Sequence, residues 1–486
     1  MTITTAARIG RPPRARLRII SAWILIALSL CGLAMGLAAA SPEFDYAVPL
    51  SDKPSLLLAS GLITAGLLYA LLIPLAEQTE RCGLGQGRSV LAVIVVGGLA
   101  MRLTAFGSIP ALEDDWYRYL WDGAVTAHGY NPFAVSPDDA QGNDHAGGLQ
   151  TLAEQSGVII ERINHSDLKT IYPPLAQAFF ALAHLIAPWN LEAWRLVCLL
   201  AECLTLTLLL LLLARSGRTQ VWAALYWWNP IVIKELANTA HMEAVLMPAV
   251  VAAVLLAITG RRTLATGLLG IAAAVKLWPL ILAPIVLRPL WGDSRRLVAA
   301  LGLLAILLCA AALPPLLGGL DETSGFRAYA TYWQTNSAAF PVIHDVVSWM
   351  LAPCELSAET VARSARGAVA AVLLSIVFVL AWPPVRSTRD ETWRLTVAVT
   401  ALLLLSPAQF PWYLVWVLPF ACLHPWRGFV AATIFMPLYY VSFHYLASDR
   451  YEDFTTCVVW LIWVPVWIAF AWDALAARTT HEVIRA

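Results

Sequence analysis

Charged residues are scarce in this chain, and lysine is the scarcest of them. Asp, Glu, Lys and Arg make up 13% of the 486 residues, about half of the roughly 25% expected of a soluble protein. The formal net charge is zero, which argues against a nucleic acid partner. The few lysines therefore invite a functional explanation, and they are Lys53, Lys169, Lys234 and Lys276.

Several signatures of cofactor and metal chemistry are missing as well. The eight cysteines fall mostly inside apolar segments, and none stands at zinc spacing from a second Cys or His. The chain has no glycine-rich nucleotide loop and no nucleophile elbow. The sequence thus predicts neither a bound metal nor a cofactor.

Long apolar segments dominate what is present. The chain is 59% hydrophobic, with a mean hydropathy of +0.68. Apolar runs close to the ~20 residues that cross a bilayer recur along its whole length. The sequence predicts an all-α polytopic membrane bundle of roughly 12–14 spans, folded as a single integral membrane domain over residues 1–486.

Charge patterning predicts the orientation of the first spans. Five arginines precede the apolar run 19–40, which favours an uncleaved anchor with its start in the cytoplasm; they are Arg8, Arg11, Arg14, Arg16 and Arg18. Two further spans, 55–75 and 89–106, then lead outward. Residues 107–172 form a predicted outer loop with ten acidic and three basic residues, the reverse of a cytoplasmic bias.

The rest of the chain alternates in the same way. Arginine-bearing turns at 261–262, 288–296, 386–394 and 427 are predicted in the cytoplasm, as is the C-terminus. The segments 318–340, 406–412 and 448–453 are then predicted outside. The stretch 173–188 fits two topologies: it is a partly inserted helix, or a small arginine turn at 215–218 faces outward.

Some apolar segments are too short to span alone and end in Pro or a charge, as at 221–233 and 264–275. Broken helices at membrane depth are tolerated where they line a cavity, and ionisable residues there are candidates for function. We therefore expect one polar cavity, opening outward, around Lys234, Glu235, His241, Glu243 and Lys276. The alternative for Lys234 and Glu235 is a buried ion pair that only fixes helix packing.

An acidic cluster, Glu113, Asp114 and Asp115, opens the outer loop and is followed by an aromatic-rich stretch. The stretch 113–127 predicts a helix in the membrane interface, and 145–163 predicts a second one. A carboxylate here can take a proton from a hydroxyl while nearby cations stabilise a departing phosphate. The alternative is that Asp114 and Asp115 merely cap the helix.

Four motifs carry a family resemblance: EDDWYRYLWDGAVTAHGYNPF (113–133), IYPPLAQAFF (171–180), WNPIVIKELANTAHMEA (228–244) and AVKLWPLILAP (274–284). Together they resemble polyprenyl-phosphate-mannose-dependent mannosyltransferases of the GT-C superfamily, in their bacterial multi-spanning form. The resemblance implies a GT-C-like fold, an inverting reaction and a catalytic acid in the outer loop, at Asp114 or Asp115. The related eukaryotic motif Asp-x-Asp-Tyr aligns on Tyr117 and favours Asp114, but the neighbouring Asp115 keeps the choice open.

The resulting hypothesis is an enzyme of the bacterial inner membrane that works on its periplasmic side. It transfers a sugar from a polyprenyl-phosphate donor to a glycan or lipid acceptor, with Asp114 or Asp115 as the base. Mannose is the favoured sugar. Trp121 is expected to stack on sugar or lipid. The predicted donor and phosphate ligands are Arg118, Lys169, Tyr172, Lys234, Glu235, His241 and Lys276. The alternatives are a flippase for lipid-linked sugar, or the same enzyme with a glucose or arabinose donor.

Overall fold

Helices make up the regular structure of the protein. The computed structural model describes residues 13–85, 87–142 and 147–485. Within these ranges there is no strand, only an isolated parallel bridge between Thr335 and Ala408. The prediction of an all-α polytopic membrane protein is confirmed.

The first helices match the three predicted N-terminal spans. They are α1 (Pro13–Ala39), α2 (Ser55–Ala70), α3 (Leu72–Arg81) and α4 (Arg88–Ala105). Two of the arginines used to orient the first span, Arg8 and Arg11, lie outside the described residues.

The predicted outer loop holds four helices: α5 (Asp115–Ala127), α6 (Pro137–Gln141), α7 (Gly148–Ser156) and α8 (Val158–Glu161). The helix expected over 145–163 is divided at Gly157, where φ is +55°, and His145 lies outside the described residues. Helix α5 is covered on all sides from Tyr117 to Val125. A Cβ on Gly123 would stand 2.4 Å from the Phe180 carbonyl oxygen, so glycine permits the close approach of the helix that carries Phe180.

The remaining helices complete the bundle. They are α9 (Pro174–Ile186), α10 (Leu191–Arg215), α11 (Ala224–Trp227), α12 (Pro230–Val232), α13 (Glu243–Ile258), α14 (Arg262–Ala273), α15 (Ala283–Leu287), α16 (Ser294–Gly318), α17 (Gly325–Tyr332), α18 (Ala339–Leu351), α19 (Ala358–Ala381), α20 (Thr388–Leu405), α21 (Leu418–Leu423), α22 (Arg427–Phe435), α23 (Val441–Ala447), α24 (Tyr451–Asp453) and α25 (Val459–Arg485). Turns of 3-10 helix lie at Ser41–Phe44, Gln220–Ala223, Trp278–Leu282, Arg288–Leu290, Ala352–Cys354, Pro411–Trp416 and Met436–Tyr440, and π turns at Ile233–Asn238 and Phe454–Val458.

Eight helices of the described chain are long and apolar enough to cross a membrane. They are Arg16–Ala39, Ser55–Arg81, Arg88–Ala105, Leu191–Arg215, Ser294–Gly318, Ala358–Ala381, Arg427–Ala447 and Tyr451–Ala476. The predicted 12–14 spans are reached only by adding the shorter apolar helices of 10–17 residues. Those are at most about 26 Å long, less than the ~30 Å of hydrocarbon. Helix α9, with 13 residues, therefore favours the partly inserted alternative for 173–188.

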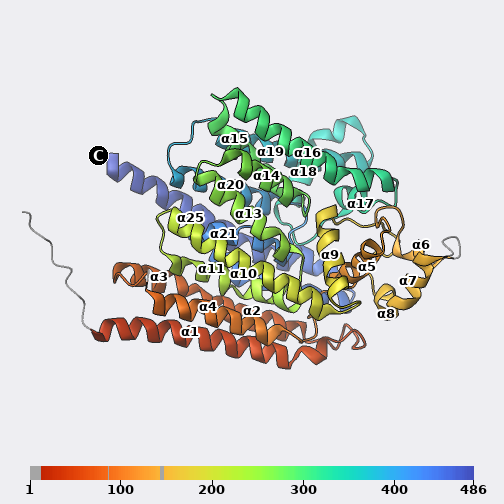
Figure 1. Cartoon of the computed structure of the whole chain (residues 1–486), viewed down its shortest axis with the longest axis horizontal. Helices are drawn as coiled ribbons and strands as arrows, with labels where there is room; N and C mark the ends of the chain where they lie inside the picture. The colour runs from red at the N-terminus through yellow and green to blue at the C-terminus, as the bar shows by residue number, and fades with distance from the viewer. Residues whose placement is uncertain (1–12, 86, 143–146, 486) are drawn as a thin grey trace, which may run out of the picture.

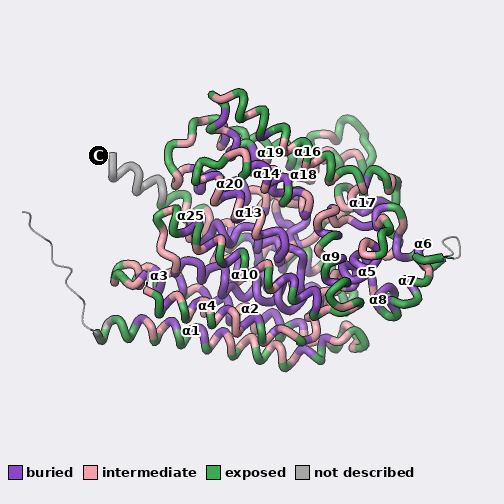
Figure 2. The backbone as a smooth tube through the Cα atoms, viewed as in Figure 1, coloured by how far each residue is buried: buried purple, intermediate pink, exposed green. Residues whose placement is uncertain are grey.

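The chain between α10 and α13 is broken, as the sequence predicts, and lies at the centre of the bundle. Every residue from 221 to 247 is buried, and Figure 2 shows this buried core. The break has a local cause. The Asn229 side chain accepts hydrogen bonds from the backbone N–H groups of Ile231 and Val232, and Pro230 takes the first helical position, where a missing N–H costs nothing.

The ends of the bundle separate the two sets of predicted turns. In Figure 1 helices α5 to α8 lie at one end, while α1 begins and α25 ends at the other. Two turns predicted in the cytoplasm meet through Arg262, whose Nη2 donates to Glu391 Oε2 at 2.9 Å. Arg288 Nε donates to the Trp382 carbonyl at 2.8 Å. Turns that the charge pattern assigned to the same side of the membrane thus contact one another in the fold.

Candidate active site

A cavity of about 580 Å³ lies where α5, α13 and α17 begin. Its walls come from all three of the chain segments that follow: the predicted outer loop 107–172, the segment 318–340 and the segment 406–412. Pockets of ~300–1,000 Å³ with a few convergent polar groups are typical of small-molecule sites. The cavity is therefore the candidate active site.

Asp114 and Asp115 both line the cavity. Asp114 occupies the N-cap position of α5, but its side chain makes no capping hydrogen bond. Instead its Oδ1 accepts a hydrogen bond of 2.5 Å from Asn164 Nδ2. Burial, and next the charge of Asp115, raise the pKa of Asp114 to about 7. Asp114 is thus not explained as a helix cap.

Two tyrosines hold the carboxylate of Asp115. The hydroxyls of Tyr119 and Tyr172 donate to Asp115 Oδ2 at 3.3 and 3.2 Å. The Asp115 side chain is 34% exposed, which leaves it open to the cavity. Tyr172, predicted to contact the donor, also lines the cavity and so stands beside the acidic pair.

Lys276 supplies the cation on the side of α13. Its Nζ donates to Glu243 Oε1 at 2.5 Å, and it lies 4.5 Å from the ring centre of Tyr413. The Lys276 side chain is 25% exposed, whereas that of Glu243 is 1% exposed. The second oxygen of Glu243 is buried and has no hydrogen-bond partner. This pair, predicted at the cavity, lines it.

Arg118 and Lys169 also line the cavity but are tied to other groups. Arg118 Nε donates to the buried Asp122 at 2.8 Å, and its Nη2 donates to the Leu168 carbonyl at 3.0 Å. Lys169 Nζ donates to Asp321 Oδ2 at 2.6 Å, and with the hydrogen bonds from Thr323 this lowers the pKa of Asp321 to about 2. The positive charge of each side chain is thus already partly compensated by an aspartate.

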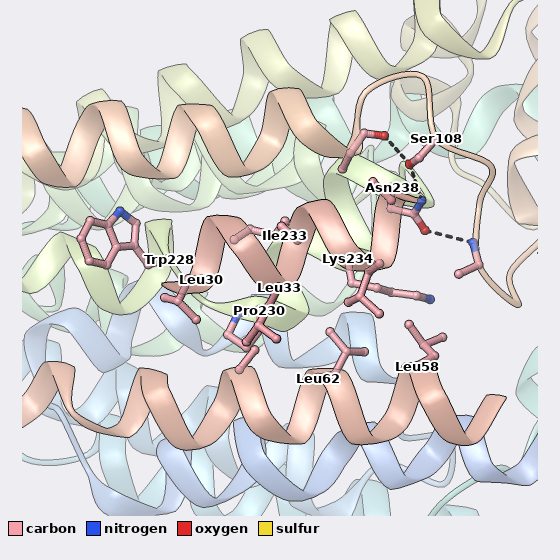
Figure 3. Close-up of a pocket in the computed structure, with 16 residues that line it drawn as sticks. Leu30, Leu33, Leu58, Leu62, Ser108, Trp228, Pro230, Ile233, Lys234 and Asn238 are labelled. Atoms are coloured by element: carbon pink, nitrogen blue, oxygen red, sulfur yellow. Dashed lines mark hydrogen bonds between the residues drawn. The ribbon is translucent and has the colours of Figure 1, made fainter. Parts of the chain in front are cut away.

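Lys234, Glu235 and His241, which we expected around the same cavity, do not line it. Lys234 Nζ lies 3.2 Å from Glu235 Oε1 and 4.3 Å from the ring centre of Tyr440. Its side chain lines a separate apolar crevice of about 50 Å³, and Figure 3 shows it there near Leu58 and Leu62. Sequence proximity could not reveal which wall each side chain faces, because the π turn at 233–238 sets these directions.

Sequence reasoning missed an aromatic wall of the cavity. Its members share a place in or near the predicted outer segments, and they are Tyr329, Phe410, Trp412, Tyr413 and Trp416. The Pro411-Trp412-Tyr413 sequence was a signal that could have found them, because aromatics beside an outer proline turn face the interface. Trp121, expected against sugar or lipid, is instead 2% exposed and packs beside Trp189 away from the cavity.

Glu113, the first residue of the acidic cluster, was given no role from the sequence but also lines the cavity. Its Oε1 is buried without a hydrogen-bond partner, and burial raises its pKa well above the ordinary value.

Among the residues described, no group of three or more His, Cys, Asp or Glu side chains is arranged to hold a metal ion. Independence from metal stays a prediction.

Comparison with known proteins gives two matches. The profile of glycosyltransferase family 87 matches residues 170–407. The α-(1→6)-mannopyranosyltransferase A of Mycobacterium tuberculosis is 27% identical over 379 residues, which are 70% of this chain and 67% of that protein. Both matches support a mannosyltransferase family of the GT-C type. No solved structure matches the protein.

The apolar helices and the family support a multi-pass membrane glycosyltransferase. The matched range includes Tyr172, Lys276 and Tyr329, and it ends before the rest of the aromatic wall, which is Phe410, Trp412, Tyr413 and Trp416. It begins after Asp114 and Asp115. The assignment of the acidic cluster to the candidate active site is therefore supported by the geometry of the cavity and not by the family profile.

Proposed function

We propose that this glycosyltransferase transfers a sugar, mannose in the first instance, from a polyprenyl-phosphate donor to an acceptor hydroxyl. The observation that carries the proposal is a single cavity with two carboxylates at α5, a lysine beside the start of α13, and an aromatic wall between them. The name of the mycobacterial relative supports mannose as the sugar. A glycan or a lipid is the proposed acceptor.

The proposed reaction is one displacement with inversion. The acceptor oxygen attacks the anomeric carbon, and the bond from that carbon to the phosphate oxygen breaks. The proton goes to a carboxylate, Asp114 or Asp115, acting as general base. The phosphate leaves with the electron pair, and Lys276 stabilises the charge that develops on it. A β-linked donor then gives an α-glycoside, and the step requires no metal.

The aromatic wall fits both parts of the donor. Trp412 and Phe410 stack on each other with ring centres 4.3 Å apart. Trp412 also stacks on His241, so the wall offers mainly ring edges to a sugar and an apolar surface to an isoprenoid chain. Lys169 and Arg118 reach the same cavity and are proposed as secondary contacts to the phosphate.

We place the reaction on the periplasmic side of a bacterial inner membrane. The support is the acidic excess of residues 107–172, together with the cavity formed by the predicted outer segments. The start of α1, which carries Arg14, Arg16 and Arg18, lies at the opposite end of the bundle.

Transfer by purified protein tests the proposal. Protein in detergent is mixed with a synthetic polyprenyl-phosphate donor carrying radiolabelled mannose and with membrane glycolipid extract as acceptor. We expect labelled product without any sealed compartment. A flippase would give none in detergent, and would move the lipid only in vesicles. Glucose and arabinose donors in parallel reactions test the sugar, and equal transfer from all three would contradict mannose as the preferred sugar.

Asn variants test the base. We expect that Asp114→Asn or Asp115→Asn lowers the transfer rate by about 100-fold or more, the usual contribution of a general base. Full transfer by both variants would contradict a base in the acidic cluster.

A further inference from the structure

Behind Asp115 lies a buried chain of polar groups that the proposed reaction does not yet use. His241 Nδ1 lies 3.8 Å from Asp115 Oδ2, and His241 Nε2 lies 3.1 Å from Glu235 Oε2. The Tyr119 hydroxyl bridges these two residues, because it lies 3.3 Å from Asp115 Oδ2 and 3.4 Å from His241 Nδ1. The side chains of His241 and Glu235 are 1% and 0% exposed.

The fold holds the imidazole in this place. Its ring stacks on Trp412 with the centres 3.9 Å apart and the planes at 18°. The backbone on its N-terminal side is fixed too, because Trp194 Nε1 donates to the Ala240 carbonyl at 2.6 Å and Ala240 has a φ of +55°. A non-glycine residue in that region is uncommon and persists only where its surroundings require it.

Glu235 is equally well fixed. Its carboxylate accepts hydrogen bonds from Lys234 Nζ at 3.2 Å, from Thr239 Oγ1 at 3.1 Å and from the Tyr440 hydroxyl. Lys234 thus acts as the counter-ion that keeps a buried carboxylate next to the histidine. This is a role for Lys234 inside the protein, distinct from contact with a phosphate in the cavity.

We infer that Asp115 is the carboxylate that receives the proton, and that His241 and Glu235 are positioning residues that orient it and accommodate that proton. The inference rests on the proposed function. With its proton on Nε2, which lies 3.1 Å from Glu235 Oε2, neutral His241 presents the Nδ1 lone pair toward Asp115 and Tyr119. The acceptor proton moves to Asp115 and can be shared through the Tyr119 hydroxyl with Nδ1. The resulting imidazolium lies between two carboxylates, which stabilise its charge.

The distance of 3.8 Å between Asp115 and His241 is longer than a hydrogen bond, but the bridging hydroxyl of Tyr119 shortens the path. Catalytic hydrogen bonds are often long before the substrate binds and tighten in the complex. Asp114 has no comparable partner, because its Oδ1 faces the amide of Asn164. The two neighbouring aspartates therefore differ in whether a buried relay stands behind them.

A kinetic comparison of variants tests the inference, with wild-type transfer from the polyprenyl-phosphate mannose donor as reference. We expect His241→Gln and Glu235→Gln each to lower kcat at least about tenfold while the KM for the donor changes less than about twofold. Asp115→Asn should lose about 100-fold or more and Asp114→Asn much less. His424→Gln is the matched control, because His424 is a buried histidine that contacts Thr392 away from the cavity, and it should keep the wild-type kcat.

The pH profile separates positioning from mere packing. His241→Gln removes the ring nitrogen that receives the proton through Tyr119, so it should change the pH dependence of kcat, while His424→Gln should keep the wild-type profile. The charged and titratable groups that interact with His241 come from the start of α5 and from the π turn at 233–238, and they are Asp114, Asp115, Tyr119 and Glu235. Lys234 and Tyr440 in turn contact Glu235.

The outcomes are distinct. Unchanged kcat and pH profile in folded His241→Gln would overturn the inference, as would a larger loss in Asp114→Asn than in Asp115→Asn. Should His241→Gln fail to fold, Glu235→Gln and His241→Asn provide the same test. A wild-type protein that transfers no sugar would instead contradict the proposed function. Failure of the relay with an active wild type leaves that function standing.

Discussion

Two sites in the bundle bury opposite charges, and they differ in what surrounds them. Arg102 on α4 and Glu202 on α10 form an ion pair of 2.6 Å in which both side chains are 1% exposed. Arg102 Nη1 also donates to the Trp227 carbonyl at 2.7 Å, and the guanidinium lies 3.5 Å from the Trp227 ring centre. Neither residue lines the cavity, so this pair only joins helices.

The charges of the candidate active site are more exposed. The side chains of Lys276 and Asp115 are 25% and 34% exposed and face a cavity of about 580 Å³. Glu243 and Glu202 each leave one buried oxygen without a hydrogen-bond partner, so the two sites differ in access to the cavity and not in how fully their carboxylates are bonded. An intramembrane charge is thus informative about chemistry when its side chain faces a cavity. A closed pair, shielded from the cavity, indicates helix packing.

The largest effect on stability is expected at the closed pair. Glu202→Gln leaves Arg102 buried without its counter-ion, and removing one partner of a buried pair costs about 3–5 kcal/mol. The melting temperature in detergent should fall markedly, while the transfer rate per folded molecule stays near that of the wild type. The double variant Arg102→Met with Glu202→Leu is the control and should recover much of the stability. Wild-type melting of Glu202→Gln would contradict the packing role.

Lys276→Met is expected to act mainly on the reaction. A hydrogen bond to a charged group contributes about 1.5–3 kcal/mol, so kcat/KM for the lipid-phosphate donor should fall roughly 10- to 100-fold. Lys276→Arg keeps the positive charge and should retain most of the activity. Equal activity of the Met and Arg variants would contradict the proposed contact between Lys276 and the phosphate.

Asp114 should make stability depend on pH. Its pKa in the folded protein is raised to about 7, above the ~3.9 of an unfolded chain. The folded state therefore binds more protons between these values, and stability falls as pH rises from about 4 to about 7. Asp114→Asn should remove this contribution, so the difference in melting temperature, variant minus wild type, should rise from pH 5 to pH 8. Parallel melting curves for the two proteins across that range would refute the raised pKa.

The smallest effect is expected at the exposed ion pair of Lys169 and Asp321. The Asp321 side chain is 55% exposed, and pairs in water contribute little. Asp321→Asn should change the transfer rate by less than about twofold and leave melting nearly unchanged. A large loss of transfer would show that the contact between the outer loop and residues 318–324 matters to the reaction.

Much of the fold followed from the sequence because apolar length and charge bias report directly on the bilayer. The spans beginning near Ser55 and Ser89, the break at Asn229-Pro230 and the acidic start of α5 were all predicted. The number of full spans was not, since a short apolar run reads alike whether it crosses the membrane or ends inside the bundle. Helix α9 is such a case.

The residue types of the candidate site could be predicted from the sequence, but the directions of their side chains could not. The sequence pointed to Asp114, Asp115 and Lys276, which share the cavity. It could not tell that Lys234 faces Glu235 and a separate crevice, because side-chain direction depends on the π turn at 233–238. Nor did composition distinguish Trp412 at the cavity from Trp121 in the interior.

One paired measurement tests the central claim most directly: transfer of radiolabelled mannose and thermal melting, recorded for Asp115→Asn and Glu202→Gln beside the wild type. We predict that Asp115→Asn melts like the wild type but loses about 100-fold or more of its transfer rate. Glu202→Gln should show the reverse, with low melting and normal transfer per folded molecule. Full transfer by folded Asp115→Asn would contradict Asp115 as the base, and full transfer by folded Asp114→Asn as well would contradict the claim that the open cluster, and not the closed pair, performs the chemistry.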